Sequence, residues 1–182
     1  MRRPRGAQAA PAIEILVESA RWNRRRGVQP LLRRAIAGAS TALPAKAARS
    51  TSGAELAIVL TNDSAIRELN RTWRGKDEPT NVLAFPTDPQ GRPDRLLGDI
   101  VIAYETLARE ARAERKLFDH HLAHLAVHGF LHLCGYDHES DRQAATMERL
   151  ETAIHGSGRV TGNPEVAPDW SRGKLANDPT GI

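Results

Sequence analysis

The stretch HGFLHLCGYDH, residues 128–138, constrains the fold more than any other part of the chain. His128 and His132 are four residues apart, so on an α-helix they share one face, about 6 Å apart along the axis. Gly135 then favours a left-handed C-cap that ends the helix and turns the chain, which brings His138 back toward the pair. Three imidazoles with an open fourth position are typical of a catalytic zinc site. We therefore expect one metal ion at this corner.

The spacing H-x-x-x-H-x-x-G-x-x-H is also that of the metzincin metalloproteases. In those enzymes a glutamate follows the first histidine and acts as the general base, whereas this chain has Gly129 there. The residues therefore predict hydrolysis by a metal-activated water and disfavour a peptide substrate. The alternative is that the histidines are ordinary core or surface residues, which requires three of them to take this spacing by accident.

Length and composition set the broad class of the protein. With 182 residues, the chain is long enough for one domain with a substantial core. No apolar run approaches a membrane span, and the arginine-rich start lacks the apolar segment of a secretory signal. A single cysteine fits a reducing cytoplasm. Residues 1–50 carry a net charge of +9 and the rest −5, which suits a polyanionic partner or reflects a nucleotide-composition bias to arginine.

Hydrophobic periodicity predicts a single α/β domain, of α+β type, with a mixed sheet of about four strands covered by helices. The motif helix should be central and well buried. We expect a basic flexible arm over 1–11, the domain over 12–155 and a disordered tail over 156–182. Strands are predicted at 12–19, 55–60, 81–86 and 96–104, helices at 31–43, within 61–74 and at 105–115, 119–134 and 139–154, and loops at 22–30 and 74–80.

Arg74 is the first candidate outside the histidine motif for stabilising negative charge on a phosphate. It lies in the predicted loop 74–80, where functional side chains are common, and Arg71 and Lys76 flank it. The alternative is a surface ion pair with a neighbouring acidic residue, Asp77 or Glu78.

Four further residues each have two interpretations. Asp137 either orients a histidine or is an ordinary turn residue. His124 is interpreted as a buried, hydrogen-bonded histidine rather than a fourth ligand. Cys134 could be a soft metal ligand, but it lies about 200° around the helix from His132, so we expect a small core residue there. Trp73 either stacks on a nucleobase or anchors the packing of a loop.

Three motifs in order, NRTWRGKDEPTNVLAFP, LGDIVI and HGFLHLCGYDH, resemble the YbeY family of bacterial endoribonucleases, also called ribosomal RNA maturation factors. The similarity extends from about Glu55 to Ile154. It implies a single α/β domain in which His128, His132 and His138 hold one metal ion, usually taken as Zn²⁺.

The resemblance also implies a cytoplasmic, metal-dependent, single-strand-specific endoribonuclease that acts in 16S rRNA 3′-end maturation and ribosome quality control. Its expected partners are the 16S rRNA precursor, the 30S subunit or 70S ribosome and ribosome-associated proteins, without a membrane. The family's functionally important arginine matches Arg74, and we expect Arg71 and Lys76 to bind RNA. Ala84 departs from the family, which usually has serine there. The rival hypotheses are a metzincin-like metallopeptidase and a non-catalytic ribosome-assembly factor.

Overall fold

The computed structural model of the chain describes residues 9–87, 96–136 and 141–156. The arm predicted over 1–11 lies outside these residues except for its last three positions. The predicted tail lies outside them except for Gly156, which ends a helix.

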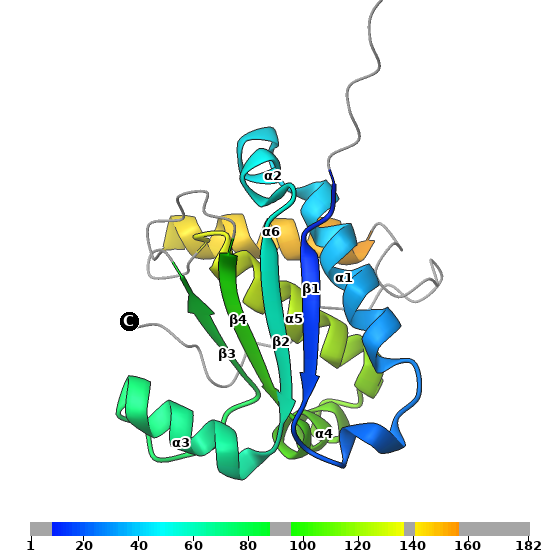
Figure 1. The fold of residues 1–182 in the computed structure, drawn as a ribbon, viewed down its shortest axis with the longest axis vertical. Helices are drawn as coiled ribbons and strands as arrows, with labels where there is room; N and C mark the ends of the chain where they lie inside the picture. Colours follow the sequence, from blue (N-terminus) through cyan, green and yellow to red (C-terminus); the bar gives the residue numbers. More distant parts are fainter. Residues whose placement is uncertain (1–8, 88–95, 137–140, 157–182) are drawn as a thin grey trace, which may run out of the picture.

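Four strands form one mixed sheet within the described residues, in the order β1-β2-β4-β3. The strands β1 (Ala12–Val17), β2 (Glu55–Thr61) and β4 (Leu96–Ala103) run parallel, and β3 (Val82–Pro86) lies antiparallel to β4 at one edge (Figure 1). The predicted mixed sheet of about four strands is therefore confirmed.

The helices follow the predicted order with one addition. The helix predicted at 31–43 ends one residue earlier, at Ala42, and Pro44 is the N-cap of a second helix that the periodicity does not predict. Proline is tolerated at a helix start because the missing N–H would have no helical partner there. The six α-helices of the described residues are α1 (Val28–Ala42), α2 (Ala45–Thr51), α3 (Asp63–Arg74), α4 (Tyr104–Ala113), α5 (Phe118–Leu133) and α6 (Asp141–Gly156).

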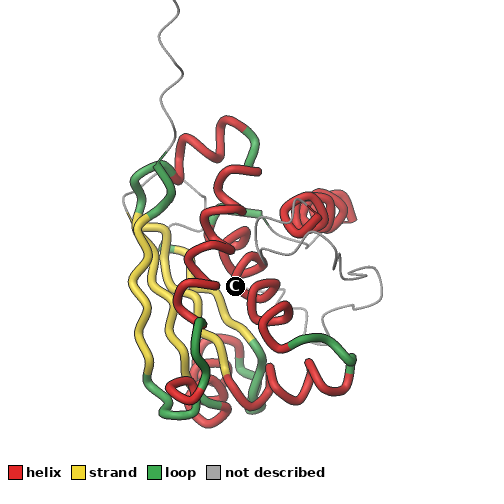
Figure 2. The backbone as a smooth tube through the Cα atoms, turned by 90° about the vertical axis from the view of Figure 1, so that its right-hand side faces the viewer, coloured by secondary structure: helices red, strands yellow, loops and turns green. Residues whose placement is uncertain are grey.

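Alternation along the strands divides the core in two. Ile100 and Ile102 of β4 face the main core, which α1 and α5 cover, whereas Val101 and Ala103 face a smaller cluster under Ile66 of α3. Most helices therefore lie on one side of the sheet (Figure 2), and α3 packs on the other. None of the helices in these segments is both long enough and apolar enough to cross a membrane.

The basic segment 22–30 is more ordered than the predicted loop. It begins with a 3₁₀ turn, η1 (Trp22–Arg24), and α1 already starts at Val28, with Pro30 in its first turn. Trp22 is buried, and its Nε1 donates to the carbonyl oxygen of Thr61 at 2.8 Å. A buried tryptophan thus anchors this arginine-rich segment to the end of β2.

Candidate metal centre

Helix α5 lies at the centre of the molecule, as predicted. Every residue from His121 to Leu131 is buried, since the helix packs against β3, β4 and α1. His128 is 3% exposed and His132 is half-buried one turn later. The motif therefore places one imidazole inside the core and the next at its margin.

The two described histidines of the motif point toward each other. Nε2 of His128 and Nε2 of His132 are 3.1 Å apart. Two nitrogens bound to one tetrahedral Zn²⁺ at about 2.0–2.1 Å lie about 3.3 Å apart, so the pair already has the spacing of two metal ligands. The same separation also suits a hydrogen bond between the rings.

Gly135 ends the motif helix as the sequence predicts. Its φ is 82°, the left-handed conformation that glycine adopts without strain. The N–H of Gly135 donates to the carbonyl of His132 at 2.9 Å, and the N–H of Tyr136 donates to that of Leu131 at 3.0 Å. These two bonds form a Schellman motif, which turns the chain at Gly135, three residues after the second histidine.

The predicted third ligand, His138, lies outside the described residues, as does Asp137. Within the segments that the structure describes, no group of three potential metal ligands occurs. The histidine pair at 128 and 132 is therefore the part of the predicted triad whose geometry is known.

Glu151 of α6 contacts the first histidine of the pair, a contact that the motif does not indicate. Its Oε1 lies 2.8 Å from Nδ1 of His128. The residue lies four positions after Met147 and three before Ile154, both buried on the inward face of α6. A carboxylate at an inward helical position is the sequence signal that could have identified it.

The β-strands supply the wall behind the histidine helix. Gly129, next to the first histidine, packs against Ile100 of β4. Ala84 of β3 is the cross-strand partner of Ile100 and packs against the same core. Ala84, where the family usually has serine, thus lies on the sheet face that α5 covers.

Two histidines upstream in α5 are also buried, as expected for His124. His121 Nε2 lies 2.9 Å from Oε2 of Glu110, and the same oxygen accepts from Nδ2 of Asn81 at 2.9 Å. This network connects α5, α4 and the start of β3. His124 is 7% exposed and its ring stacks on that of His121, with ring centres 6.4 Å apart.

Cys134 is the C-cap residue of α5 and lies partly in the core. Burial raises the pKa of its thiol to about 12. The thiol is therefore protonated at neutral pH and behaves as a small, nearly apolar group. The prediction of a small packing residue is consistent with this environment.

Arg74 is the last residue of α3 rather than part of a loop, which corrects the predicted boundary. Gly75 follows in the left-handed conformation, with φ 67°, and ends the helix. Asp77, one suggested partner of Arg74, accepts hydrogen bonds from both Nε and Nη2 of Arg67. Because α3 and α5 pack on opposite faces of the sheet, Arg74 and the histidine pair come from different layers.

The other two predicted RNA-binding residues lie at the same end of α3. Arg71 is exposed and donates to both carboxylate oxygens of Glu68, at 2.7 and 2.8 Å. This contact raises the pKa of Arg71. Lys76 is exposed beyond the helix end. Trp73 is 65% exposed, with its ring centre 6.0 Å from that of Phe85, so it is not a buried anchor.

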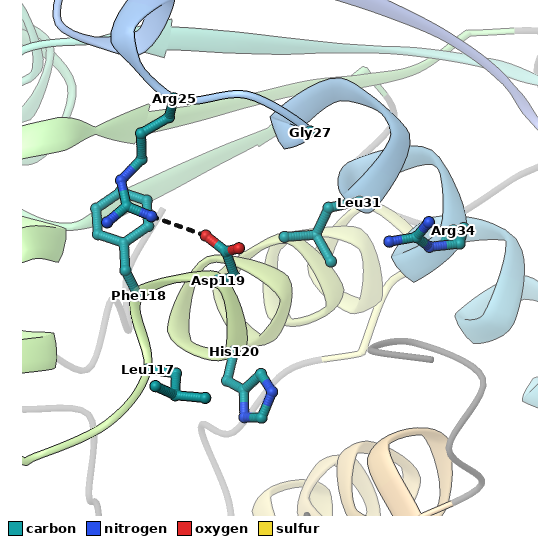
Figure 3. Close-up of a pocket in the computed structure, with 8 residues that line it drawn as sticks. All are labelled: Arg25, Gly27, Leu31, Arg34, Leu117, Phe118, Asp119 and His120. Atoms are coloured by element: carbon teal, nitrogen blue, oxygen red, sulfur yellow. Dashed lines mark hydrogen bonds and ion pairs between the residues drawn. The ribbon is translucent and has the colours of Figure 1, made fainter. Parts of the chain in front are cut away.

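A groove of about 420 Å³ lies at the start of α5, far along the helix from the histidine pair. In Figure 3, the guanidinium of Arg25 covers the Phe118 ring at 3.6 Å and binds Asp119 at 2.9 Å. Arg34 stands on the opposite wall. The Asp119 carboxylate balances Arg25, so Arg34 supplies the groove's uncompensated positive charge.

Comparison with known proteins shows which family this chain matches. The family model described as Endoribonuclease YbeY matches residues 23–157. This range includes α5, the histidine motif and all of α6.

Curated relatives are similar over most of their length. A Nitrobacter winogradskyi protein named Endoribonuclease YbeY is 55% identical over 152 residues, covering 80% of this chain and 78% of the relative. A Rhodopseudomonas palustris protein of the same name is 52% identical over 150 residues, covering 80% and 77%. The solution structure of a Thermotoga maritima protein superposes with a TM-score of 0.54 at 25% identity, covering 88% of this chain and 99% of that one.

Proposed function

Because the chain belongs to the Endoribonuclease YbeY family, we propose that it cleaves single-stranded RNA at a metal centre formed by His128, His132 and His138. The observation that carries this proposal is the 3.1 Å separation of the Nε2 atoms of the first two histidines. The Schellman turn at Gly135 supports it, because the turn redirects the chain directly before the third histidine.

Three neutral imidazoles suit Zn²⁺, which we propose as the resident ion. When bound, such an ion supplies Lewis acidity toward a phosphoryl oxygen and makes water nucleophilic near neutral pH. The chain itself provides a fixed orientation for His128, whose ring is enclosed by the core, and access at His132, whose ring is half-buried. The substrate would therefore approach from the side of His132.

Arg74 would stabilise the negative charge that develops on the phosphate. A guanidinium presents paired donors that match phosphate oxygens, and such a contact strengthens as charge builds up. Gly75 fixes the end of α3, so the backbone that carries Arg74 is set before RNA binds.

The exposed end of α3 would bind the RNA strand. Arg71 and Lys76 supply positive charge for the backbone, and Trp73 offers a ring on which an unpaired base can stack. Non-specific stacking on an aromatic ring together with backbone contacts favours single strands over duplexes.

The biological substrate that we propose is the 3′ end of the 16S rRNA precursor. This assignment includes a cytoplasmic role in ribosome quality control, with the 30S subunit or 70S ribosome and their associated proteins as partners. It rests on the resemblance of the three motifs to the family rather than on a contact in the structure.

Two measurements test the proposal together. Elemental analysis should find about one zinc per chain in the wild type and much less in His132→Ala. In an assay on single-stranded RNA, Arg74→Ala should lose about 100-fold or more in rate while it keeps its metal. Arg49→Ala, a change of the same type at the exposed end of α2, should cleave normally.

The rival functions predict other outcomes. A ribosome-assembly factor without catalysis would leave Arg74→Ala as effective as the wild type in rRNA maturation in cells. A metallopeptidase would cleave a peptide library and leave RNA intact. Gly129 disfavours the second rival, since it provides no carboxylate beside the first histidine.

A further inference from the structure

Glu151 holds His128 by the ring nitrogen that faces away from His132. Oε1 of Glu151 is 2.8 Å from Nδ1 of His128, while Nε2 of the same ring is 3.1 Å from His132. A carboxylate oxygen only accepts, so Nδ1 carries a hydrogen, and in the neutral ring Nε2 is then the nitrogen with the lone pair. The hydrogen bond therefore selects the tautomer that can bind a metal through Nε2.

We propose that Glu151 is a positioning residue of the metal centre, which fixes the tautomer and the ring orientation of His128. The inference rests on the metal centre of the proposed function. Glu151 acts through the histidine and is not itself a proposed ligand.

Burial strengthens the contact between Glu151 and His128. The side chains of His128 and Glu151 are 4% and 15% exposed. In such an environment a hydrogen bond to a charged group is stronger than in water, and little solvent is present to replace a lost partner. The ring of His128 is therefore held by the carboxylate and the surrounding core rather than by water.

The position of Glu151 in α6 favours a specific role over simple packing. Its neighbours on the inward face, Met147 and Ile154, are buried and apolar. An apolar residue at position 151 would continue that face without the cost of burying a carboxylate. The acid is therefore explained by the imidazole that it contacts.

Carboxylates behind ligating histidines orient the ring and raise its basicity, and their loss weakens metal binding about 10- to 100-fold. For this chain we expect Glu151→Gln, which keeps the shape and an acceptor but loses the charge, to weaken Zn²⁺ about tenfold. Glu151→Ala should approach 100-fold.

The test measures metal affinity, separately from activity. Metal-free wild type, Glu151→Gln and Glu151→Ala are titrated with Zn²⁺ against a chromophoric chelator, and their thermal unfolding is recorded in EDTA. Glu148→Gln is the matched control, because it makes the same change at an exposed position three residues earlier in α6. The proposal predicts weaker zinc in both Glu151 variants and wild-type affinity in Glu148→Gln.

Three results would overturn the proposal. Equal zinc affinity of Glu151→Gln, Glu151→Ala and the wild type would show that the carboxylate does not position the ring. A lower unfolding temperature in EDTA with unchanged zinc affinity would make Glu151 a tether between α5 and α6 only. A wild type that binds no zinc would remove the metal centre itself, which distinguishes failure of the proposed function from failure of this inference.

A spectroscopic readout checks the orientation directly. With Co²⁺ in place of Zn²⁺, the visible absorption reports the ligand geometry. Glu151→Ala should alter that spectrum at saturating Co²⁺, whereas Glu148→Gln should reproduce the spectrum of the wild type.

Discussion

A β-carbon on Gly129 would lie 2.9 Å from Cγ2 of Ile100, at the contact between α5 and β4. The side chain of Ile100 is completely buried, so moving it aside would disturb the packed core around it. Any side chain directly after His128 would therefore enter the sheet interface. The helix carries the histidine spacing of a metallopeptidase in a packing environment that excludes the metallopeptidase glutamate.

Gly129→Ala should accordingly destabilise the protein although alanine favours helices. The better helix propensity is worth about 1 kcal/mol, and overpacking of a filled core costs about 1–3 kcal/mol. Because two further atoms of Ile100 would lie at 3.3 Å, we expect the clash to dominate, with a net loss of up to about 2 kcal/mol. Urea denaturation followed by circular dichroism measures the change.

A substitution of Ile100, the residue that the added β-carbon would contact, provides the control. Ile100→Ala should itself cost about 2–5 kcal/mol by leaving a cavity. The double variant with Gly129→Ala should lose less stability than the sum of the losses measured in the two single variants. Strict additivity would show that the two residues do not compete for the same space.

Local patterns predicted most elements of this fold because each has a period or a turn residue that marks it. The alternation of Ile13, Ile15 and Val17 gives β1, and Gly135 ends α5 where expected. The family membership inferred from the three motifs is also confirmed. The helix α2 was missed because its seven residues, AKAARST, are too few to show an amphipathic period.

The candidate site was only partly predictable, for a different reason. The spacing of His128 and His132 is a local property of one helix, so sequence alone gives their convergence. The contact of Glu151 with His128 joins residues 23 positions apart through the packing of two helices. The predicted loop 74–80 begins one residue too early, because the helix continues to Arg74 and ends at the left-handed Gly75.

Loss of the Glu110 carboxylate should destabilise the domain without touching the metal centre. Its Oε2 accepts from both Asn81 and His121, and the side chains of His121 and Glu110 are 2% and 18% exposed. Glu110→Ala leaves two donors without their acceptor, which costs about 1–3 kcal/mol for a buried group. Chemical denaturation should show this loss, whereas zinc affinity should remain that of the wild type.

A matched variant separates this effect from a change in helix charge. Glu114→Ala removes the same charge at the surface end of α4, where the carboxylate contacts Lys116. We expect a change within about 0.5 kcal/mol there. A similar loss in both variants would argue against the buried network.

The Asp77 carboxylate should titrate below its usual range. Hydrogen bonds from Arg67, at 2.8 and 2.9 Å, and the positive charge of that guanidinium lower the pKa of Asp77 from 3.8. The pair therefore stabilises the folded state above pH 3.8, and this contribution is lost as the pH falls through the lowered pKa of the folded protein. Carboxyl ¹³C NMR should find a low midpoint in the wild type and a normal one in Arg67→Gln; equal midpoints would contradict the pairing.

Trp73→Ala should weaken binding of single-stranded RNA without changing its salt dependence. Stacking of a base on an aromatic ring is worth about 1–3 kcal/mol, and removal of the ring removes no charge. Lys76→Ala should instead lower the slope of log affinity against log salt by about 0.7, the value for one phosphate contact on a single strand. Fluorescence anisotropy of a labelled oligonucleotide at several salt concentrations measures both quantities.

The variant Trp73→Phe tests whether an aromatic ring at position 73 is what RNA binding requires. Phenylalanine keeps an aromatic face at the exposed end of α3, so this variant should retain most of the affinity that Trp73→Ala loses. Trp73 contacts Phe85, so a purely structural role would appear as a lower unfolding temperature with unchanged RNA affinity. Because 65% of the residue is exposed to solvent, we expect the opposite: normal stability and weaker RNA binding.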